Sequence, residues 1–258
     1  MSAEIFNIVI PMAGKGSRFT QAGYAQPKPL LPVHGKPMID VVVENLRPTT
    51  LHRFIFICQR EHLDSYGLRA HLKSLAQNVE IIAIDSVTEG AACTVLLAEH
   101  LINNSQPLMI ANCDQYVAVS MDHYLASMSQ GNHDGFIMTM TAHDPKWSFI
   151  RYDASGKIKE VVEKQVVSSE ATVGIYNYRR GSDFVSAAKA MIHADDRVNG
   201  EFYVAPVYNY LIKRGLSVGF LNIGSDGAGM YGLGTPEDLK SFNALPEIPR
   251  AKTNHYLI

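Results

Sequence analysis

Short apolar runs alternate with amphipathic segments over the first 130 residues. The runs predict buried strands at residues 5–12, 54–58, 79–84 and 108–111. Between them, apolar side chains recur three and four residues apart, which predicts helices that begin at Pro37 and that span residues 61–75, 91–101 and 121–128. This rhythm of strand and helix is typical of an α/β fold, with a mainly parallel, mixed sheet covered by helices on both faces.

The pattern changes after residue 130, where strand-like segments follow one another closely. They cover residues 135–141, 148–152, 157–162 and 172–178, with a turn at residues 153–156. Helices return near residues 184–191 and 205–213, and Thr235 followed by Pro236 marks one more helix start. Since no linker forces a boundary, we expect a single domain over residues 1–243 and a C-terminal tail over residues 244–258.

Composition narrows the classes of function. Hydrophobic residues make up 47% of the 258 residues and charged residues 19%, as in a globular protein with a sizeable core. The net charge of -2 and the scattered basic residues give no sign of a nucleic-acid or membrane partner. The spacing of Cys58, Cys93 and Cys113 fits neither a zinc site nor a disulfide framework, and the N-terminus lacks a signal-like apolar run. We therefore expect a cytoplasmic protein.

A glycine-rich segment follows the first predicted strand. Gly14 and Gly16 allow the backbone to pass close to a ligand, and successive N–H groups there can hold phosphate oxygens. Arg18 can bind two phosphate oxygens at once, and Lys28 adds a compact positive charge. The segment lacks the spacing of a Walker loop, and Phe19 replaces the third glycine of the dinucleotide fingerprint. The pattern favours a phosphate-binding loop of another kind.

Two motifs in this segment resemble those of a known family. Gly14-Lys15-Gly16-Ser17-Arg18 and Lys28-Pro29-Leu30-Leu31-Pro32 resemble the G-x-G-[ST]-R and K-P-[LM]-[LV]-P blocks of the sugar-phosphate nucleotidyltransferases, such as glucose-1-phosphate thymidylyltransferase. The resemblance extends to the Gly234-Thr235-Pro236 region. It implies a Rossmann-like fold of the GT-A type. It also implies a nucleotide-binding half over about residues 1–130 and an acceptor-binding half over about residues 131–243.

The resemblance implies which residues bind the nucleotide. In the loop these are Ala13, Gly14, Gly16 and Ser17. Thr88 and Gly90 lie between a strand and a helix, where the family contacts the base, and Asn112 follows the fourth strand. A strand-to-helix turn without a ligand is the alternative for Thr88 and Gly90. The turn lacks the Gln and Leu that are common in thymidylyl and uridylyl members, which slightly favours CTP.

Asp114 matches an aspartate with which the family holds a metal. A carboxylate at the end of a strand suits Mg²⁺ bound against triphosphate oxygens, although it could instead cap a turn. Many members carry a second aspartate ligand near the C-terminus, and this chain has Gly232 at that position. Asp226, a little earlier in a glycine-rich stretch, is the candidate replacement.

The second half carries the residues that the resemblance assigns to the acceptor. Lys164 matches the lysine that grips the phosphate of the second substrate, but Gln165 replaces the proline that normally follows it. Glu163, Gly174 and Glu201 are further acceptor-binding candidates. A solvated strand end is the alternative for Glu163 and Lys164, and a helix cap is the alternative for Glu201.

These positions indicate the transfer of a nucleoside monophosphate from an NTP to a small phosphorylated metabolite, such as a sugar phosphate, with Mg²⁺ and release of pyrophosphate. Arg18, Lys28 and Lys164 would offset charge, since an ionised phosphate nucleophile needs no general base. Trp147 stands in place of the usual sugar-enzyme loop, so the acceptor need not be a common hexose. The product would be an activated precursor for a surface polysaccharide or its modification. The tail could serve a homo-oligomer.

Two other functions fit part of the pattern. A GT-A glycosyltransferase would use a sugar nucleotide, but it usually carries an Asp-x-Asp pair where this chain reads Asn112-x-Asp114. A non-catalytic homologue, without a second metal ligand, would bind an NTP and turn over no acceptor. Release of pyrophosphate from the NTP separates the transferase from both alternatives.

Overall fold

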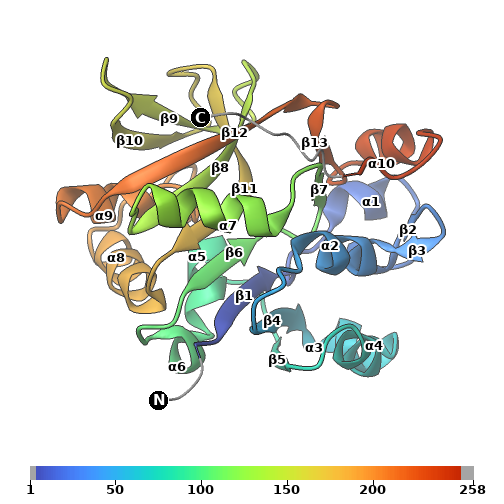
Figure 1. Ribbon diagram of the computed structural model, residues 1–258. Coiled ribbons are helices and arrows are strands. Elements are labelled where there is room, and N and C mark those ends of the chain that lie inside the picture. The colour runs from blue at the N-terminus through green and yellow to red at the C-terminus, as the bar shows by residue number, and fades with distance from the viewer. Residues whose placement is uncertain (1–3, 251–258) are drawn as a thin grey trace.

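The computed structural model describes residues 4–250, and its centre is one sheet of eleven strands. The strand order is β5-β4-β1-β6-β11-β8-β12-β13-β7, and the β9–β10 pair is attached to β11 (Figure 1). The strands are β1 Phe6–Pro11, β4 His52–Gln59, β5 Val79–Ile84, β6 Leu108–Ala111, β7 Gln115–Val117, β8 Gly135–Thr141, β9 Ser148–Tyr152, β10 Ile158–Glu163, β11 Glu170–Tyr178, β12 Val218–Asp226 and β13 Gly229–Gly232. Along this order five of the eight neighbouring pairs are parallel, whereas β11 runs antiparallel to β6 and β8, and β13 runs antiparallel to β7. The predicted mainly parallel, mixed sheet is confirmed.

Helices cover both faces because the central strands are apolar on both sides. In β1, Ile8 and Ile10 belong to one buried cluster and Val9 belongs to the other, as the alternation of a strand requires. The first cluster is covered by α1 Ser17–Gln21, α2 Met38–Leu46, α3 Arg60–Ser65, α4 Leu68–Ser74, α7 Met121–Gln130 and α10 Pro236–Asn243. The second is covered by α5 Ala91–Leu96, α6 Glu99–Ile102, α8 Gly181–His193 and α9 Val207–Lys213. In Figure 1, α7 crosses the front of the sheet and α5 lies behind it.

Two predicted helices are each divided in two. The segment at residues 61–75 forms α3 and α4, because Gly67 adopts a left-handed φ of 63° between them. The apolar periodicity continues across the break, since Leu63 and Leu68 are buried in the same cluster. The segment at residues 91–101 similarly forms α5 and α6.

Other elements were not predicted. The loop at residues 13–26 contains the short helix α1, and Lys28–Leu30 forms a 3-10 turn. Both β12 and β13 were missed, because β12 is half exposed along most of its length and five glycines lie within residues 218–232. Glycine-rich, partly exposed strands lack the apolar run by which the other strands are recognised.

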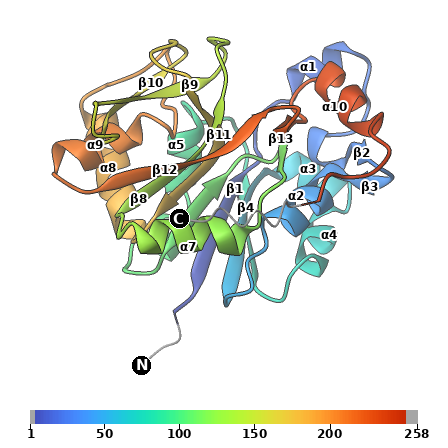
Figure 2. The same cartoon turned by 45° about the horizontal axis from the view of Figure 1, so that its top comes forward.

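The C-terminal part of the chain packs against the first half. His34 Nε2 lies 3.0 Å from Phe242 O, which joins α10 to the short ribbon of β2 (Pro32–Val33) and β3 (Lys36–Pro37). Figure 2 shows α10 beside α1 and this ribbon. In the expected tail, Pro249 O accepts a hydrogen bond from Tyr116 Oη at 2.5 Å, whereas residues 251–258 lie outside the described part. Within residues 4–250, no helix has the length and apolar character needed to cross a membrane.

Candidate active site

The loop after β1 is fixed at its start and open in its middle. Gln59 Nε2 donates a hydrogen bond to Ala13 O at 2.8 Å, which fastens the loop to β4. Gly16 has a left-handed φ of 61° and is the N-cap of α1. A Cβ at Gly14 would meet no atom within 4 Å, so this residue faces open space. The loop therefore presents backbone to its surroundings from a rigid base.

Lys28 and Asp114 form an ion pair beside this loop. Lys28 Nζ lies 2.9 Å from Asp114 Oδ2, and the two side chains are 22% and 25% exposed. Burial alone would lower the pKa of Lys28, but the charge and hydrogen bond of Asp114 raise it above its ordinary value. Both residues line a cavity of about 230 Å³ together with Gly14. Lys28 therefore stays positively charged, and it lies at the cavity that Gly14 of the loop also lines.

Ser17 and Arg18 lie in the first turn of α1, and both are exposed. A Cβ at Gly16, two residues before Arg18, would lie 3.6 Å from Lys28 Cβ, and the charge of Arg18 acts to lower the pKa of Lys28, so the two cations lie on the same side of the loop within electrostatic range. Two neighbouring cations next to a glycine loop suit a ligand that carries several negative charges.

Asn112 packs against Gly174 of the neighbouring strand β11. Asn112 N–H donates to Gly174 O at 3.0 Å, and Gln115 Nε2 donates to the same oxygen at 3.1 Å. Gly174 has a φ of 80°, and a Cβ there would overlap Asn112 Nδ2 and lie 2.6 Å from Gln115 Oε1. The close approach of two amide side chains therefore explains why this position is a glycine. Its predicted role in binding the acceptor stays a prediction.

A second cavity, of about 350 Å³, shares Pro11 and Gly14 with the first. Its other lining residues are Ala13, Lys15, Val87, Thr88, Gly90, Ala91, Thr94 and Glu201. The predicted base turn and the predicted phosphate loop therefore lie at one continuous edge of the sheet, which is where α/β sheets bind ligands.

Gly90 in this cavity is held by a segment from the second half. It has a φ of 136°, and a Cβ there would overlap Phe202 O. Ala92 N–H donates to Phe202 O at 3.0 Å, and Phe202 N–H donates to Glu89 O at 2.9 Å. The turn at residues 88–91 and the segment at residues 200–203 are therefore one rigid unit.

Lys164 lies in a small polar cluster with the acceptor-half candidates. Its Nζ donates to Tyr203 Oη at 2.5 Å, and this hydrogen bond is the main cause of the raised pKa of Lys164. Glu163 accepts a hydrogen bond from Ser148 Oγ, and burial raises the pKa of Glu163. The charge of Glu201 acts on both Glu163 and Lys164, and Glu201 also lines the 350 Å³ cavity. The cluster therefore adjoins the base turn.

The two metal candidates are not brought together. Asp114 lies just before β7, and its backbone oxygen accepts a hydrogen bond from Leu233 N–H at 2.8 Å. Asp226 ends β12 and lies opposite Met230 in the strand register, so β13 stands between Asp226 and β7. No cluster of three or more His, Cys, Asp or Glu residues that could hold a metal occurs within residues 4–250. Asp114 still fits Mg²⁺, which is often bound through one or two carboxylates with substrate phosphates completing its shell.

Four residues near the site were not among the predicted ones. Lys15 lines the 350 Å³ cavity, Tyr203 contacts Lys164, and Ser148 and Gln115 hold Glu163 and Gly174. Lys15 lies within the loop motif, and its charge was a signal that could have been used. Tyr203 and Ser148 gave no local signal, because their partners are distant in sequence.

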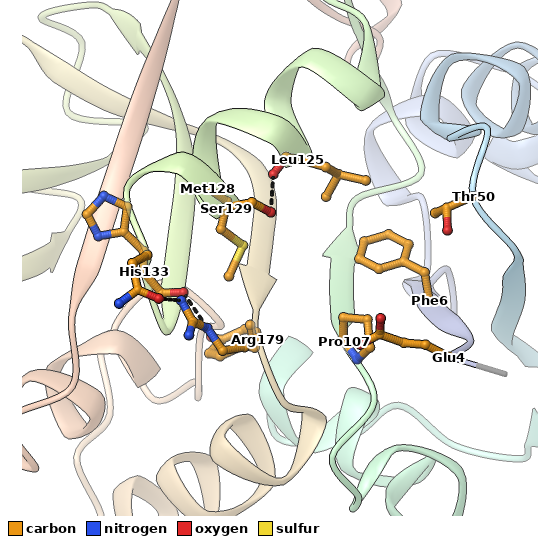
Figure 3. A pocket seen from close by; sticks show the side chains of 11 residues that line it. Glu4, Phe6, Thr50, Pro107, Leu125, Met128, Ser129, His133 and Arg179 are labelled. Atoms are coloured by element: carbon orange, nitrogen blue, oxygen red, sulfur yellow. Dashed lines mark hydrogen bonds between the residues drawn. The ribbon is translucent and has the colours of Figure 1, made fainter. Parts of the chain in front are cut away.

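A cavity of about 430 Å³ lies at the other edge of the sheet, where β1, β6 and β8 begin (Figure 3). Arg179 there donates to His133 O at 3.0 Å and to Asn132 Oδ1 at 2.8 Å. These bonds fasten the turn before β8. None of the predicted site residues lies in this cavity, and we assign it no function.

A sheet of this order, with a glycine loop and an ion pair at the carboxyl edge of its parallel strands, defines the class of α/β nucleotide-binding proteins. Within this class, the family model described as Nucleotidyl transferase matches residues 8–210. The chain therefore belongs to the nucleotidyl transferase family of enzymes. The family inferred from the loop motifs is confirmed.

Similar proteins agree with this assignment. The bifunctional protein GlmU of Paraburkholderia xenovorans is 28% identical over 226 residues, which are 82% of this chain and 46% of that protein. GlmU of Bacillus cereus strain AH187 is 26% identical over 217 residues, or 80% of this chain and 44% of that protein. The chain thus spans less than half the length of these relatives.

Solved structures show the same fold. The nucleoside-diphosphate-sugar pyrophosphorylase from Vibrio cholerae RC9 has a TM-score of 0.78 and 26% identity, with 92% of this chain and 100% of that chain covered. A putative glucose-1-phosphate thymidylyltransferase from Bacillus anthracis has a TM-score of 0.74 and 22% identity, with 93% and 94% covered. The predicted nucleotidyltransferase fold is confirmed.

Proposed function

We propose that this enzyme transfers a nucleoside monophosphate from an NTP to a small phosphorylated acceptor and releases pyrophosphate. The observation that carries the proposal is the Lys28–Asp114 pair, 2.9 Å apart, at a cavity that Gly14 also lines. A fixed cation, a carboxylate and open backbone at one place are the groups needed to hold a triphosphate.

The reaction needs positioning and charge neutralisation. A phosphate oxygen of the acceptor attacks the α-phosphorus, and pyrophosphate leaves in line with the attack. Lys28 and Arg18 offset the charge that builds up on the leaving pyrophosphate. Gly14 offers backbone N–H to phosphate oxygens because no side chain shields it. An ionised phosphate nucleophile needs no general base, so no residue is assigned that role.

Asp114 is the residue that would hold Mg²⁺. A magnesium ion bound there with the triphosphate would neutralise phosphate charge and fix the geometry of the leaving group. Asp226 is left without a role in this proposal, because it pairs with Met230 rather than lying beside Asp114.

The acceptor is assigned to the cluster around Lys164. Lys164 and Tyr203 together present a cation and a hydroxyl beside the 350 Å³ cavity that Glu201 lines. A sugar phosphate is the acceptor that the Vibrio cholerae pyrophosphorylase name supports. The product would then serve as an activated precursor for a surface polysaccharide or its modification, and a cytoplasmic setting is part of the same proposal.

Pyrophosphate release tests the proposal. Each of the four NTPs is incubated with Mg²⁺ and a panel of sugar 1-phosphates and other small phosphorylated metabolites. We expect release with one NTP and one acceptor, and a loss of roughly 100-fold or more in Lys28→Ala. Lys36→Ala is the matched control, since Lys36 pairs with Glu44 on the exposed surface at 3.2 Å.

The alternatives give different results in the same experiment. A glycosyltransferase would release a nucleoside diphosphate from a sugar nucleotide and no pyrophosphate from any NTP. A non-catalytic homologue would bind an NTP and turn over no acceptor in the panel. Equal rates for Lys28→Ala and Lys36→Ala would also refute the assignment of Lys28.

A further inference from the structure

Two threonine hydroxyls and one carbonyl form a closed hydrogen-bonded group in the base turn. Thr88 Oγ1 lies 2.6 Å from Thr94 Oγ1 and 2.9 Å from Gly90 O. Thr94 Oγ1 lies 3.2 Å from the same carbonyl. Thr94 is only 8% exposed, and the turn around Gly90 is held by the backbone hydrogen bonds of Glu89 and Ala92 with Phe202. The group is therefore both compact and held in place.

The hydroxyl protons of this group are committed within it. Two protons are available for three short contacts, and two arrangements satisfy them best. In one, Thr94 donates to Thr88 and Thr88 donates to Gly90 O. In the other, Thr88 donates to Thr94 and Thr94 donates to Gly90 O. In both arrangements the proton of Thr88 stays inside the group, so Thr88 Oγ1 offers only lone pairs to a ligand.

Thr88 lines the same cavity as Lys15 and Gly14 of the phosphate loop. A nucleotide whose phosphates lie at that loop would have its base near Thr88. Glu201 lines the cavity too, and its carboxylate is also a hydrogen-bond acceptor. Lys15 is a donor in the same cavity, but it belongs to the phosphate loop. Beside the base turn, Thr88 Oγ1 and Glu201 are acceptors, and they favour a ligand group that donates.

We infer that Thr88 selects a base that carries an exocyclic amino group, cytosine or adenine, against bases that carry a carbonyl at that position. The inference rests on the proposed function, because the phosphate loop sets where the base lies. A carbonyl could bind Thr88 only if its proton left the internal group, which would give up one hydrogen bond. The expected preference is about tenfold, equivalent to about 1.4 kcal/mol.

Equilibrium binding with Mg²⁺ tests the inference without an acceptor. CTP and UTP differ at one ring position as amino and oxo forms, and ATP and ITP differ in the same way. We expect the amino member of at least one pair to bind about tenfold more tightly. Thr88→Val keeps the shape of the side chain without the oxygen and should remove the preference. Thr88→Ser keeps the hydroxyl and should retain it.

The outcomes separate this inference from the proposed function. Equal or tighter binding of UTP and ITP would overturn the inference, as would a preference that survives in a folded Thr88→Val variant. Pyrophosphate release with UTP in preference to CTP and ATP would leave the transferase standing and refute the selection by Thr88. An amino preference in binding, with no turnover of any acceptor, would support the inference while the proposed function fails.

Discussion

Gly174 is a residue that protein contacts alone require. Its φ of 80° is unfavourable for other residues, and a Cβ would overlap the Asn112 amide. We expect Gly174→Ala to lower the free energy of unfolding by about 2–5 kcal/mol, the sum of backbone strain and overpacking. Gly156→Ala, with a φ of 79° and nothing within 4 Å of its Cβ, should lose only about 1–2 kcal/mol. Urea denaturation measures both, and equal losses would contradict the packing argument.

Glu163 makes the stability of the enzyme depend on pH. Burial raises its pKa above the ordinary 4.5, more than the Ser148 hydrogen bond and the charge of Lys164 lower it. The folded state then holds the proton more tightly than the unfolded state, so the stabilisation by protonated Glu163 is complete below the unfolded pKa. It is lost as pH rises through the folded pKa.

Glu163→Gln should therefore gain stability relative to wild type as pH rises from 4 towards 7. Gln does not titrate, but it keeps an oxygen that accepts from Ser148. The pH dependence of the stability difference between the two proteins therefore reports the titration of Glu163. Urea unfolding at several pH values measures the difference. Glu160→Gln on the exposed part of the same strand is the control, since an exposed pair such as Glu160–Arg151 contributes little. A stability difference, Glu163→Gln minus wild type, that stays constant or falls as pH rises would contradict the assignment.

At the scale of elements, the base turn and the segment at residues 200–203 depend on each other through Gly90. Gly90→Ala would push Phe202 away and displace Glu201 and Tyr203 with it. We expect a loss of at least about 2 kcal/mol in stability and a higher KM for the acceptor as well as for the NTP. Gly200→Ala, where a Cβ meets nothing within 4 Å, is the matched control. A change confined to the KM of the NTP would show that the two segments are independent.

The sequence predicts those elements and site residues that are determined by residues close to them in the chain. β1 and α2 are recognisable because their own apolar periodicity buries them. The loop glycines and Lys28 fall within one short motif. Lys164 and Tyr203 are 39 residues apart, so only the fold brings them together. The break at Gly67 comes from a left-handed backbone conformation, which the spacing of apolar side chains does not reveal.

At the scale of the whole molecule, the two halves share one sheet. β6 of the first half pairs with β11 of the second, and β7 pairs with β13. Strands of the two halves are paired at more than one place in the sheet. Unfolding of either half would therefore expose an unpaired strand edge of the other. A single domain over residues 1–243 is the prediction that follows, and each half offers a probe for it.

Trp147 is the one tryptophan of the chain and reports on the second half, whereas Cys58 and Cys113 are buried thiols of the first. Burial, with a contribution from Cys113, raises the pKa of Cys58 to about 12, so its thiol should react only after unfolding. In a Cys93→Ser variant, which lacks the half-buried third thiol, we expect thiol labelling and Trp147 fluorescence to give the same urea midpoint. Labelling that precedes the fluorescence change would mean that the nucleotide-binding half unfolds on its own, and the single-domain prediction would then be wrong.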